Sequence, residues 1–460
     1  MFKKVLIANR GEIAVQIIRA LREMGIQSVA VYSTADQDSL FVKLADEAVC
    51  IGGPQPGESY LNMEAIIDTA VLTGSDAIHP GYGFLSENAE FAELCEQCHI
   101  KFIGPSASVI DLMGNKAHAK ATMKQAGVPT IPGSDGAVKT VDDAITAANQ
   151  IGYPVMLKAA AGGGGKGIRK VVDDDAMRAI YPTTQREIRL SFDDDTLYLE
   201  KDLSDAKHIE MQAIADQAGH VVYFPERDCS LQRGHQKIIE ESPCMLVSQE
   251  QRDYLGSLVV KAMQEIGYEN TGTIEFLLDE KNMQFYFMEM NTRLQVEHTV
   301  TEEVAGVELI KSQVMVAQGE SLPYTQADCA PKGFAIECRI NAENPATGFT
   351  PSPGKIKALR FPFGTKGVRI DAGVEAGDVI SPFYDSMIAK LIVHMPTKAQ
   401  AVNKMRRVIK EFKIEGVATN QAFLYDLLDD EHFKASDFNN MYIENSFLKA
   451  WLNKNDTTKS

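Results

Sequence analysis

The first quarter of the chain alternates short apolar runs with segments in which apolar residues recur every three to four positions. The apolar runs predict strands at residues 3–8, 28–32, 48–51, 76–79 and 101–103. The periodic segments predict helices after the first strand and at residues 61–72 and 87–98. Strands alternating with helices predict a parallel, doubly wound α/β sheet, whose ligands usually bind at the loops that follow the strands.

Two of these loops have unusual sequences. Residues 8–12 read ANRGE, and residues 79–88 read HPGYGFLSEN. The second loop approaches the dinucleotide fingerprint but lacks its last glycine, so a nicotinamide site is a weak alternative. One long helix is expected at residues 106–126. Its three lysines lie four residues apart on one face: Lys116, Lys120 and Lys124.

A second module follows a proline- and glycine-rich linker at residues 127–134. Two predicted strands, 153–159 and 168–172, flank a run with four consecutive glycines. A strand rather than a helix follows this run, and Lys166 is not followed by Ser or Thr, so neither a dinucleotide fingerprint nor a P-loop fits. The run predicts a hairpin loop whose backbone N–H groups close over phosphates, and a merely flexible surface loop is the alternative.

A hairpin is predicted from residues 271–278 and the apolar run that starts at Phe285. A symmetric turn about Asn282 places six residues on one face: Thr273, Glu275, Leu277, Phe287, Glu289 and Asn291. The other face carries Ile274, Phe276, Met288 and Met290. Opposed Glu275 and Glu289 repel each other, which favours a hard cation such as Mg²⁺ between them, with nucleotide phosphates and water as further ligands. Two surface glutamates on an exposed sheet face are the alternative.

The polar run after this hairpin places Asn291, Arg293, Gln295 and Glu297 at every second position. If the backbone stays extended, their side chains share a face that suits a small anion, and a charged edge strand is the alternative. A second polar run gathers four basic residues, Arg227, Arg233, His235 and Lys237. This run predicts an anion site or a solvated basic loop. Beyond residue 331, short alternating segments predict a mainly β region closed by helices, and residues 453–460 read as a frayed tail.

Composition narrows the function classes. The chain has 460 residues, enough for two or three domains, and a net charge of -17, which argues against nucleic-acid or anionic-membrane partners. Its longest apolar runs are shorter than a signal-peptide core or a membrane span. Seven cysteines are scattered, and the Cys95–Cys98 pair lies in a predicted helix without a second pair for zinc. We therefore expect a reducing, cytoplasmic compartment.

Taken in order along nearly the whole chain, these runs resemble biotin carboxylase, an ATP-grasp enzyme. The resemblance rests on NRGEIA, HPGYGFLSEN, MGNKAHA, the glycine loop, ERDCSLQRGHQK, MEMNTRLQVEH, ECRINAE and PFYDSMIAKL. It implies an N-terminal doubly wound domain, a central ATP-grasp domain with a mobile glycine-loop lid, and a C-terminal mainly β domain with helices. The corresponding boundaries are 1–113, 114–330 with a lid at about 131–203, 331–447, and a tail at 448–460.

The resemblance also implies a set of site residues. ATP would contact Lys116, Lys158, Gly163, Gly164, Gly165, Lys166, Glu200, Lys201, Leu203, His208, Gln232, His235 and Leu277. Mg²⁺ or Mn²⁺ would be bound by Glu275, Glu289 and Asn291. Bicarbonate would contact Lys237, Arg293, Gln295 and the backbone of Val296. Glu297 would be the general base, and Arg339 would stabilise negative charge on the ureido oxygen of biotin.

The implied activity is carboxylation of biotin with ATP and bicarbonate, through carboxyphosphate. The chain contains no Met-Lys-Met biotin-attachment sequence and no residues to spare for a carboxyltransferase. Biotin is therefore expected in trans on a carrier protein, with separate carboxyltransferase subunits and a homodimer of this chain. The expected complex is acetyl-CoA carboxylase, in the first step of fatty acid synthesis. A pyruvate or other acyl-CoA carboxylase, another ATP-grasp ligase and a non-catalytic paralogue are the alternatives.

The sequence departs from the family pattern at three places. Asp202 stands where many members have an aromatic residue, and residues 205–207 replace an Asn-Pro-Arg run. Both changes affect the expected adenine hinge. Thr299 replaces a common proline after the bicarbonate run, and little effect is expected from it.

Overall fold

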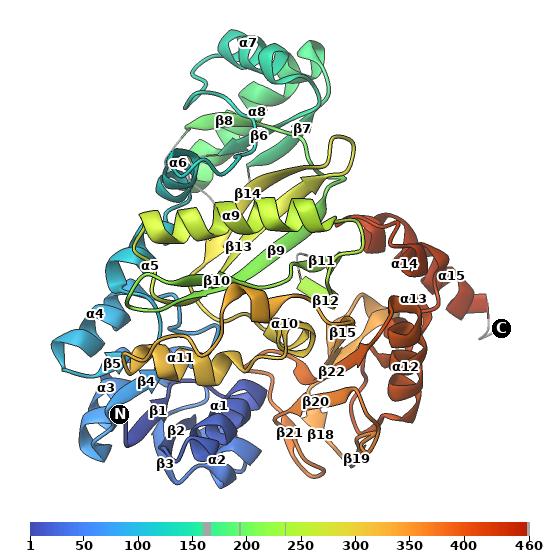
Figure 1. Cartoon of the computed structure of the whole chain (residues 1–460). Coiled ribbons are helices and arrows are strands. Elements are labelled where there is room, and N and C mark those ends of the chain that lie inside the picture. Colours follow the sequence, from blue (N-terminus) through green and yellow to red (C-terminus); the bar gives the residue numbers. More distant parts are fainter. Residues whose placement is uncertain (160–166, 193–194, 235, 458–460) are drawn as a thin grey trace.

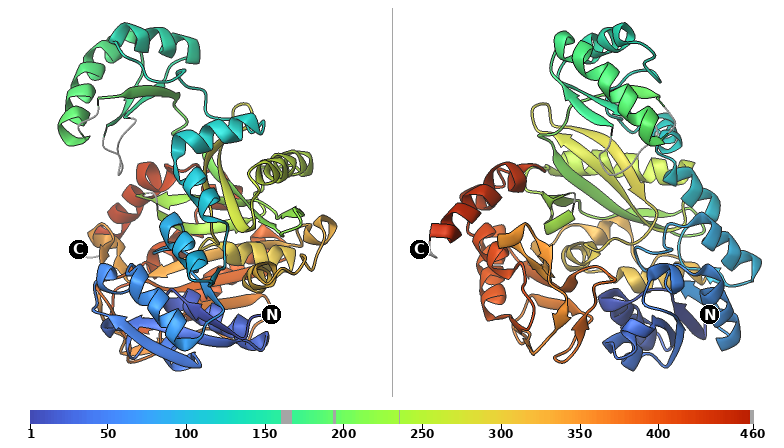
Figure 2. Two further views of the ribbon diagram at one scale, coloured as in Figure 1. Left: turned by 90° about the vertical axis from the view of Figure 1, so that its left-hand side faces the viewer. Right: turned by 180° about the vertical axis from the view of Figure 1, so that it is seen from behind.

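The protein has a broad body and one lobe that projects from it, as seen in a computed structural model (Figure 1). The structure describes residues 1–159, 167–192, 195–234 and 236–457. In both views of Figure 2 the lobe lies above the body, and the α5–α6 segment runs along one side of the body and connects to the lobe. Among the described helices, none is both long and apolar enough to cross a membrane.

The N-terminal region is a five-stranded parallel sheet in the order β3-β2-β1-β4-β5. Its strands are β1 (Lys4–Ile7), β2 (Gln27–Ser33), β3 (Glu47–Gly52), β4 (Ala77–His79) and β5 (Lys101–Phe102). Its helices are α1 (Gly11–Glu23), α2 (Leu40–Leu44), α3 (Met63–Thr73) and α4 (Ala89–Gln97). Val5 and Ile7 of β1 pack in one hydrophobic cluster with α1, while Leu6 packs in another with α3 and α4. The predicted doubly wound sheet is confirmed.

The single long helix predicted at 106–126 is wrong. The structure has two helices, α5 (Ala107–Gly114) and α6 (Lys116–Gln125), separated by Asn115 in an extended conformation. The Asn115 side chain accepts a hydrogen bond from the backbone N–H of His118 at 3.1 Å. Asparagine is a favoured N-cap residue, and Gly114 before it is a poor helix former, so the chain restarts its helix here.

The lobe contains a three-stranded antiparallel sheet in the order β7-β6-β8, covered by two helices. The elements are α7 (Val141–Ile151), β6 (Val155–Ala159), β7 (Ile168–Val171), α8 (Asp174–Phe192) and β8 (Leu197–Lys201). Leu157 and Leu199 from the sheet pack with Met177 and Tyr181 of α8 in a hydrophobic core of the lobe's own. The predicted β6–β7 hairpin is confirmed by the pairing of Lys158 with Ile168. Its glycine loop lies outside the described residues.

One nine-stranded sheet runs through the rest of the body in the order β14-β13-β9-β11-β12-β15-β22-β20, with β10 paired to β9. The strands are β9 (Lys207–Ala215), β10 (Val221–Tyr223), β11 (Arg227–Arg233), β12 (Gln236–Ser242), β13 (Asn270–Asp279), β14 (Gln284–Asn291), β15 (Phe334–Asn341), β20 (Val368–Ala372) and β22 (Met387–Met395). Helix α9 (Gln249–Glu265) covers one face in Figure 1, and α10 (His298–Ala305) and α11 (Leu309–Ala317) follow β14. The pairing of β12 with β15 carries the sheet across residue 330, and the predicted domain boundaries stay predictions.

Beyond the shared sheet, the C-terminal region adds short strand pairs and a helical layer. The strands are β16 (Glu343–Asn344), β17 (Thr350–Pro351), β18 (Gly354–Lys355), β19 (Ala358–Arg360), β21 (Val379–Ile380) and β23 (Lys413–Glu415). The helices are α12 (Lys398–Glu411), α13 (Gln421–Leu427), α14 (Glu431–Ala435) and α15 (Leu448–Thr457). The Trp451 ring of α15 lies edge-on to Phe423, 5.4 Å between ring centroids. The expected tail is therefore helical as far as Thr457, the last described residue, and is packed at Trp451.

Candidate active site

The hairpin of β13 and β14 has the predicted register at its functional end. Glu275 pairs with Glu289, and Thr273 pairs with Asn291. Beyond a bulge between Glu275 and Phe276 the prediction is wrong, because Phe276 pairs with Phe287. An extra residue in β14 reverses its facing, so Phe287 joins the hydrophobic core instead of lying beside Leu277.

Glu275 lies at the centre of a buried polar cluster. Its oxygens contact Lys237 Nζ at 3.1 Å, His208 Nε2 at 3.1 Å, Asn291 Nδ2 at 3.0 Å and Gln295 Nε2 at 2.6 Å. Burial favours a raised pKa for this carboxyl, but Lys237 and His208 outweigh it and hold the pKa below its usual range. Glu275 is therefore ionised at neutral pH.

Glu289, opposite Glu275, has fewer partners. Burial first, and then the charge of Glu275, raise the pKa of the Glu289 carboxyl. The Lys116 ammonium lies 4.0 Å from it. A divalent cation beside Glu275, Glu289 and Asn291 would relieve this repulsion, so the donor set fits a hard metal ion.

Among the described residues, two other groups of side chains could bind a metal ion, and within each group the ligand atoms lie within 4.8 Å of one another. They are His208, Glu210 and Glu275, and Glu210, Cys229 and Glu297. The Lys237 ammonium lies 2.5 Å from Glu210 and 2.6 Å from Glu297, so the charge of Lys237 already balances these carboxylates. Neither group includes Glu289.

Lys237 joins three carboxylates, those of Glu210, Glu275 and Glu297. Burial acts to lower the pKa of its ammonium, but the three carboxylates raise it well above its usual range. The permanently charged Lys237 therefore connects the hairpin to Glu297.

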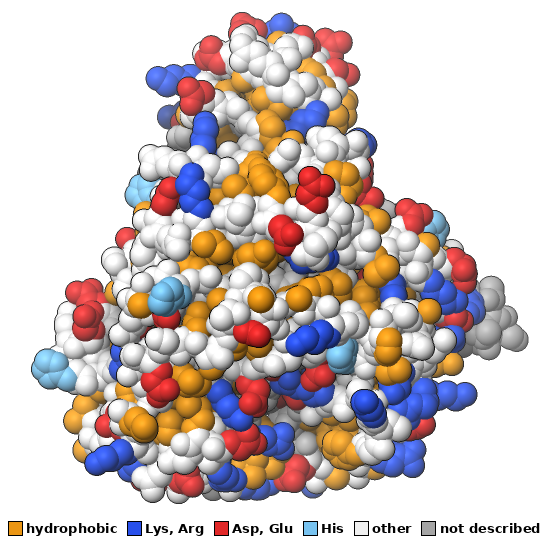
Figure 3. Space-filling view, in the orientation of Figure 1, with side chains coloured by type: hydrophobic (Ala, Val, Ile, Leu, Met, Phe, Trp, Pro, Cys, Tyr) orange, Lys and Arg blue, Asp and Glu red, His pale blue; other side chains and the backbone are white. Residues whose placement is uncertain are grey.

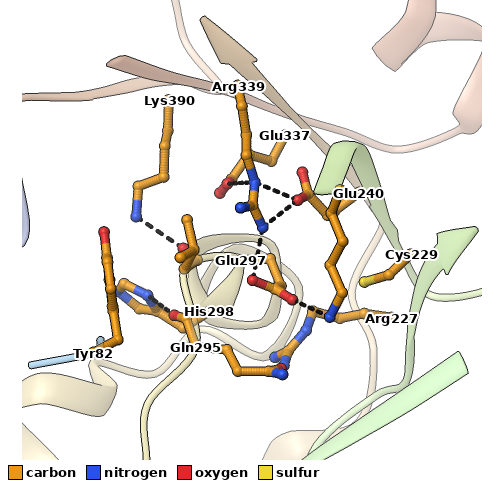
Figure 4. Close-up of polar contacts among 12 residues, drawn as sticks. Tyr82, Arg227, Cys229, Glu240, Gln295, Glu297, His298, Glu337, Arg339 and Lys390 are labelled. Atoms are coloured by element: carbon orange, nitrogen blue, oxygen red, sulfur yellow. Dashed lines mark hydrogen bonds and ion pairs between the residues drawn. The ribbon is translucent and has the colours of Figure 1, made fainter. Parts of the chain in front are cut away.

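Glu297 occupies the N-cap position of α10 and is 2% exposed. Its Oε1 contacts Lys237 Nζ at 2.6 Å, and its Oε2 accepts a hydrogen bond from Arg339 Nη2 at 2.9 Å. Burial acts to raise the pKa of Glu297, yet Lys237 and Arg339 keep it below its usual range despite the nearby charge of Glu210. Figure 4 shows Arg339 between Glu297 and Glu240, whose Oε1 accepts from Arg339 Nε at 2.6 Å.

The polar run after β14 converges by a different path from the one expected. The strand ends at Asn291 and α10 begins at His298, so the residues between them form a loop and not an extended strand. The side chains still meet, because Arg293 Nη2 donates to Asn291 Oδ1 at 2.9 Å. Lys390 Nζ donates to the carbonyl of Val296 at 2.9 Å.

The described residues of the basic run 226–237 do not form one cluster. Arg227 is fully buried and donates to Glu210 at 2.5 Å and to Gln295 at 2.6 Å. Arg233 instead donates to the Gly348 carbonyl at 2.8 Å and stacks over the Phe349 ring. Of the two interpretations of this run, the anion site does not include Arg233, because its guanidinium is engaged by Gly348 and Phe349.

The described residues expected to contact the nucleotide come from both the lobe and the body. Lys158 Nζ contacts Glu200 Oε2 at 2.5 Å, and Lys120 Nζ contacts Glu200 Oε1 at 2.9 Å. Lys201 Nζ donates to the Gly152 carbonyl at 2.6 Å. In the adjacent sheet, Leu277 pairs in register with His208, and the His208 Nδ1 atom lies 3.0 Å from Gln232 Nε2.

A cavity of about 800 Å³ lies beside the expected adenine hinge, and Lys201, Leu203 and Phe438 line its walls. Two of the departures from the family pattern, Asp202 and Asp205, also line it. Five expected contacts lie outside the described residues: Gly163, Gly164, Gly165, Lys166 and His235.

The sequence reasoning missed several ionisable residues that contact the candidate site residues. They are Glu87, Glu210, Glu240, Glu337 and Lys390. One signal was available for Glu210, a charged residue that lies between apolar Ile209 and Met211 in the run HIEMQAIA. A carboxylate there is buried only if it is paired.

Comparison with known proteins places this geometry in a family. Residues 1–110 match the biotin carboxylase N-terminal domain, and residues 337–445 match the biotin carboxylase C-terminal domain. Residues 115–325 match the ATP-binding domain of the carbamoyl-phosphate synthase L chain. The chain belongs to the biotin carboxylase family. The predicted fold and enzyme class, an ATP-grasp biotin carboxylase, are thereby confirmed.

Individual biotin carboxylase relatives are similar over nearly their whole length. Biotin carboxylase 1 of Bacillus subtilis is 52% identical over 96% of this chain and 98% of its own. The small subunit of 2-oxoglutarate carboxylase from Hydrogenobacter thermophilus is 50% identical over 96% of this chain and 93% of its own. The solved biotin carboxylase domain dimer of the same Hydrogenobacter thermophilus enzyme, in complex with magnesium ADP, ADP and bicarbonate, is 50% identical, with a TM-score of 0.88 over 96% of this chain and 97% of that one.

Proposed function

We propose that this chain uses ATP to carboxylate biotin with bicarbonate, and that Glu297 is the base. The observation that carries the proposal is the buried line of charges from Lys237 through Glu297 to Arg339, with distances of 2.6 and 2.9 Å. An ionised carboxylate between two cations can accept a proton from bicarbonate, which is a weak nucleophile until that proton leaves.

The roles of the neighbouring residues follow from their charges. Arg293 and Lys237 would hold the deprotonated bicarbonate in line with the γ-phosphate of ATP. Attack on the γ-phosphorus would expel ADP and give carboxyphosphate, which breaks into CO₂ and phosphate, and the phosphate would take the N1′ proton of biotin. Arg339 would then stabilise the negative ureido oxygen, and CO₂ would form the new N–C bond.

ATP would lie between the lobe and the hairpin. Lys116 and Lys158 would pair with its phosphates, and Glu200, Lys201 and Leu203 would contact the adenine. Glu275, Glu289 and Asn291 would hold Mg²⁺ or Mn²⁺, which neutralises charge on the phosphate oxygens when bound. One test is incorporation of radiolabelled bicarbonate into free biotin by the purified chain. Label that enters biotin only with ATP and Mg²⁺ supports the proposal, and its absence under all conditions contradicts it.

We infer further that biotin comes on a separate carrier protein, and that the complex is acetyl-CoA carboxylase, which serves fatty acid synthesis. Relatives named for pyruvate and 2-oxoglutarate carboxylases reach 50% identity, so these acceptors are the competing candidates. The tagged chain, purified from its own cells with its biotinylated partner and carboxyltransferase, should carboxylate acetyl-CoA. Carboxylation of pyruvate or 2-oxoglutarate instead would assign the chain to the other complexes.

We also propose a cytoplasmic homodimer. The dimer is supported by the dimeric biotin carboxylase domain of the Hydrogenobacter thermophilus enzyme. The compartment is supported by seven cysteines that are all free, several of them buried. Figure 3 shows acidic and basic side chains intermixed over most of one face, which is no footprint for nucleic acid there. Sedimentation velocity should give twice the monomer mass, and a monomer at all concentrations would contradict the dimer.

A further inference from the structure

We propose that Glu87, from the N-terminal region, is a positioning residue for bicarbonate because it fixes Arg293. The inference rests on the proposed bicarbonate role of Arg293. Glu87 belongs to the HPGYGFLSEN loop, which neither the fold nor the proposed chemistry has so far explained.

The Glu87 carboxylate makes two contacts to residues more than 200 positions away. Its Oε2 accepts a hydrogen bond from Arg293 Nε at 2.8 Å, and its Oε1 accepts one from the backbone N–H of Thr292 at 3.1 Å. One carboxylate thus holds both the guanidinium and the backbone at the start of the loop after β14. The next residue, Asn88, caps α4 by accepting from the backbone N–H of Phe91 at 2.7 Å, which anchors Glu87.

These contacts leave donors on Arg293 for a ligand. Its Nε is taken by Glu87, one Nη2 hydrogen by Asn291 at 2.9 Å, and one Nη1 hydrogen by the Leu294 carbonyl at 3.2 Å. A guanidinium carries five N–H groups, so each terminal nitrogen keeps one more. The guanidinium is planar, and Glu87 holds its Nε atom. The orientation of the two remaining N–H donors is therefore fixed as well.

The same loop is held at its other end from the C-terminal region. Lys390 Nζ donates to the Val296 carbonyl at 2.9 Å and pairs with Glu12 at 3.0 Å. Lys390 is fully buried, so its substitution would damage folding. The Glu87 side chain is 40% exposed, so its substitution should change the orientation of Arg293 with little effect on the stability of the fold.

The test compares Glu87→Gln with a matched control, Glu90→Gln, an exposed glutamate in the first turn of α4. Glutamine keeps the shape of Glu87 but loses the charge and one acceptor. We expect the KM for bicarbonate to rise about tenfold, because small misplacement of a binding group costs this much or more. The KM for ATP, the melting temperature and the Glu90→Gln variant should stay close to wild type.

The double variant Glu87→Gln/Arg293→Lys distinguishes an effect on the orientation of Arg293 from a general structural effect. Lysine lacks the Nε donor, so Glu87→Gln should add little to Arg293→Lys. An unchanged bicarbonate KM in Glu87→Gln, a parallel rise in both KM values with a lower melting temperature, or fully additive losses would each overturn the inference. A wild-type chain without bicarbonate-dependent turnover would instead overturn the proposed function, and this inference with it.

Discussion

Glu297 shows how neighbouring charges decide the state of a buried carboxyl. Removal from water favours the neutral acid, but two cations within hydrogen-bond distance reverse this preference. The result is a carboxylate that is ionised when the substrate arrives, as a base must be. Arg339 has the complementary position, between Glu297 and Glu240, with its charge balanced before biotin binds.

Replacing Glu297 with glutamine tests the base directly. Glu297→Gln should lower the rate of biotin carboxylation by about 100- to 10,000-fold, because general base catalysis contributes on that order. ATP binding, measured by calorimetry, should be unchanged. Near-normal turnover in the variant would remove Glu297 from this role.

Arg339→Ala should reduce biotin carboxylation more than bicarbonate-dependent ATP hydrolysis. The residue would act on biotin after carboxyphosphate has formed, so its loss leaves the earlier step intact. Both rates should be measured on the same preparation, with the melting temperature as a control, because Glu240 loses its buried partner. Equal losses in the two rates would show that Arg339 serves an earlier step.

At the scale of elements, helix α10 is joined to strand β15 by a buried hydrogen bond. Thr299, which stands in place of a common proline, donates from its hydroxyl to Glu337, and both residues are fully buried. Burial raises the pKa of Glu337 to about 8, against Lys390 and Arg339, which lower it. Sequence reasoning expected little from Thr299 because its partner lies on another strand.

Thr299→Val should lower the free energy of unfolding by about 1–3 kcal/mol, since a buried carboxyl loses its donor. Thr299→Ser keeps the hydroxyl and is the matched control, with a smaller loss. Urea denaturation of the three proteins gives both differences. A valine variant as stable as the serine variant would show that the hydroxyl contributes nothing.

Glu337 also predicts a pH dependence of stability. Its pKa in the folded chain, about 8, is above its ordinary value of 4.5. Its contribution is therefore full below about pH 4.5 and is lost as the pH rises toward about 8, because the unfolded chain releases the proton first. The melting temperature of wild type minus that of Glu337→Gln should fall across this range. A constant difference would mean that Glu337 does not titrate this way.

The elements also show which features can be predicted from sequence. The pairing of Glu275 with Glu289 followed from alternation and a symmetric turn, because both are local. The bulge after Glu275 was missed, since one extra residue leaves no mark on composition. The break at Asn115 was missed because capping competed with a continuous helical pattern.

At the scale of the whole molecule, the site is assembled from three regions of the chain. The hairpin supplies Glu275, the N-terminal region supplies Glu87, and the C-terminal region supplies Arg339. The strand pairing of β12 with β15 brings Arg339 to Glu240, although they lie 99 residues apart. Partners at such separation, like Glu240 for Arg339, leave no local pattern in the sequence. The sequence therefore predicts the motifs but not the distant residues that hold their side chains in place.

ATP hydrolysis by the purified chain, with and without bicarbonate and with and without free biotin, tests the proposed function most directly. We predict hydrolysis that requires bicarbonate and rises with biotin, because the proposed base acts on bicarbonate and the later step consumes carboxyphosphate. Hydrolysis indifferent to both would contradict the account and indicate a ligase for another carboxylate. ATP binding without hydrolysis would contradict it too, and would indicate a non-catalytic member of the family.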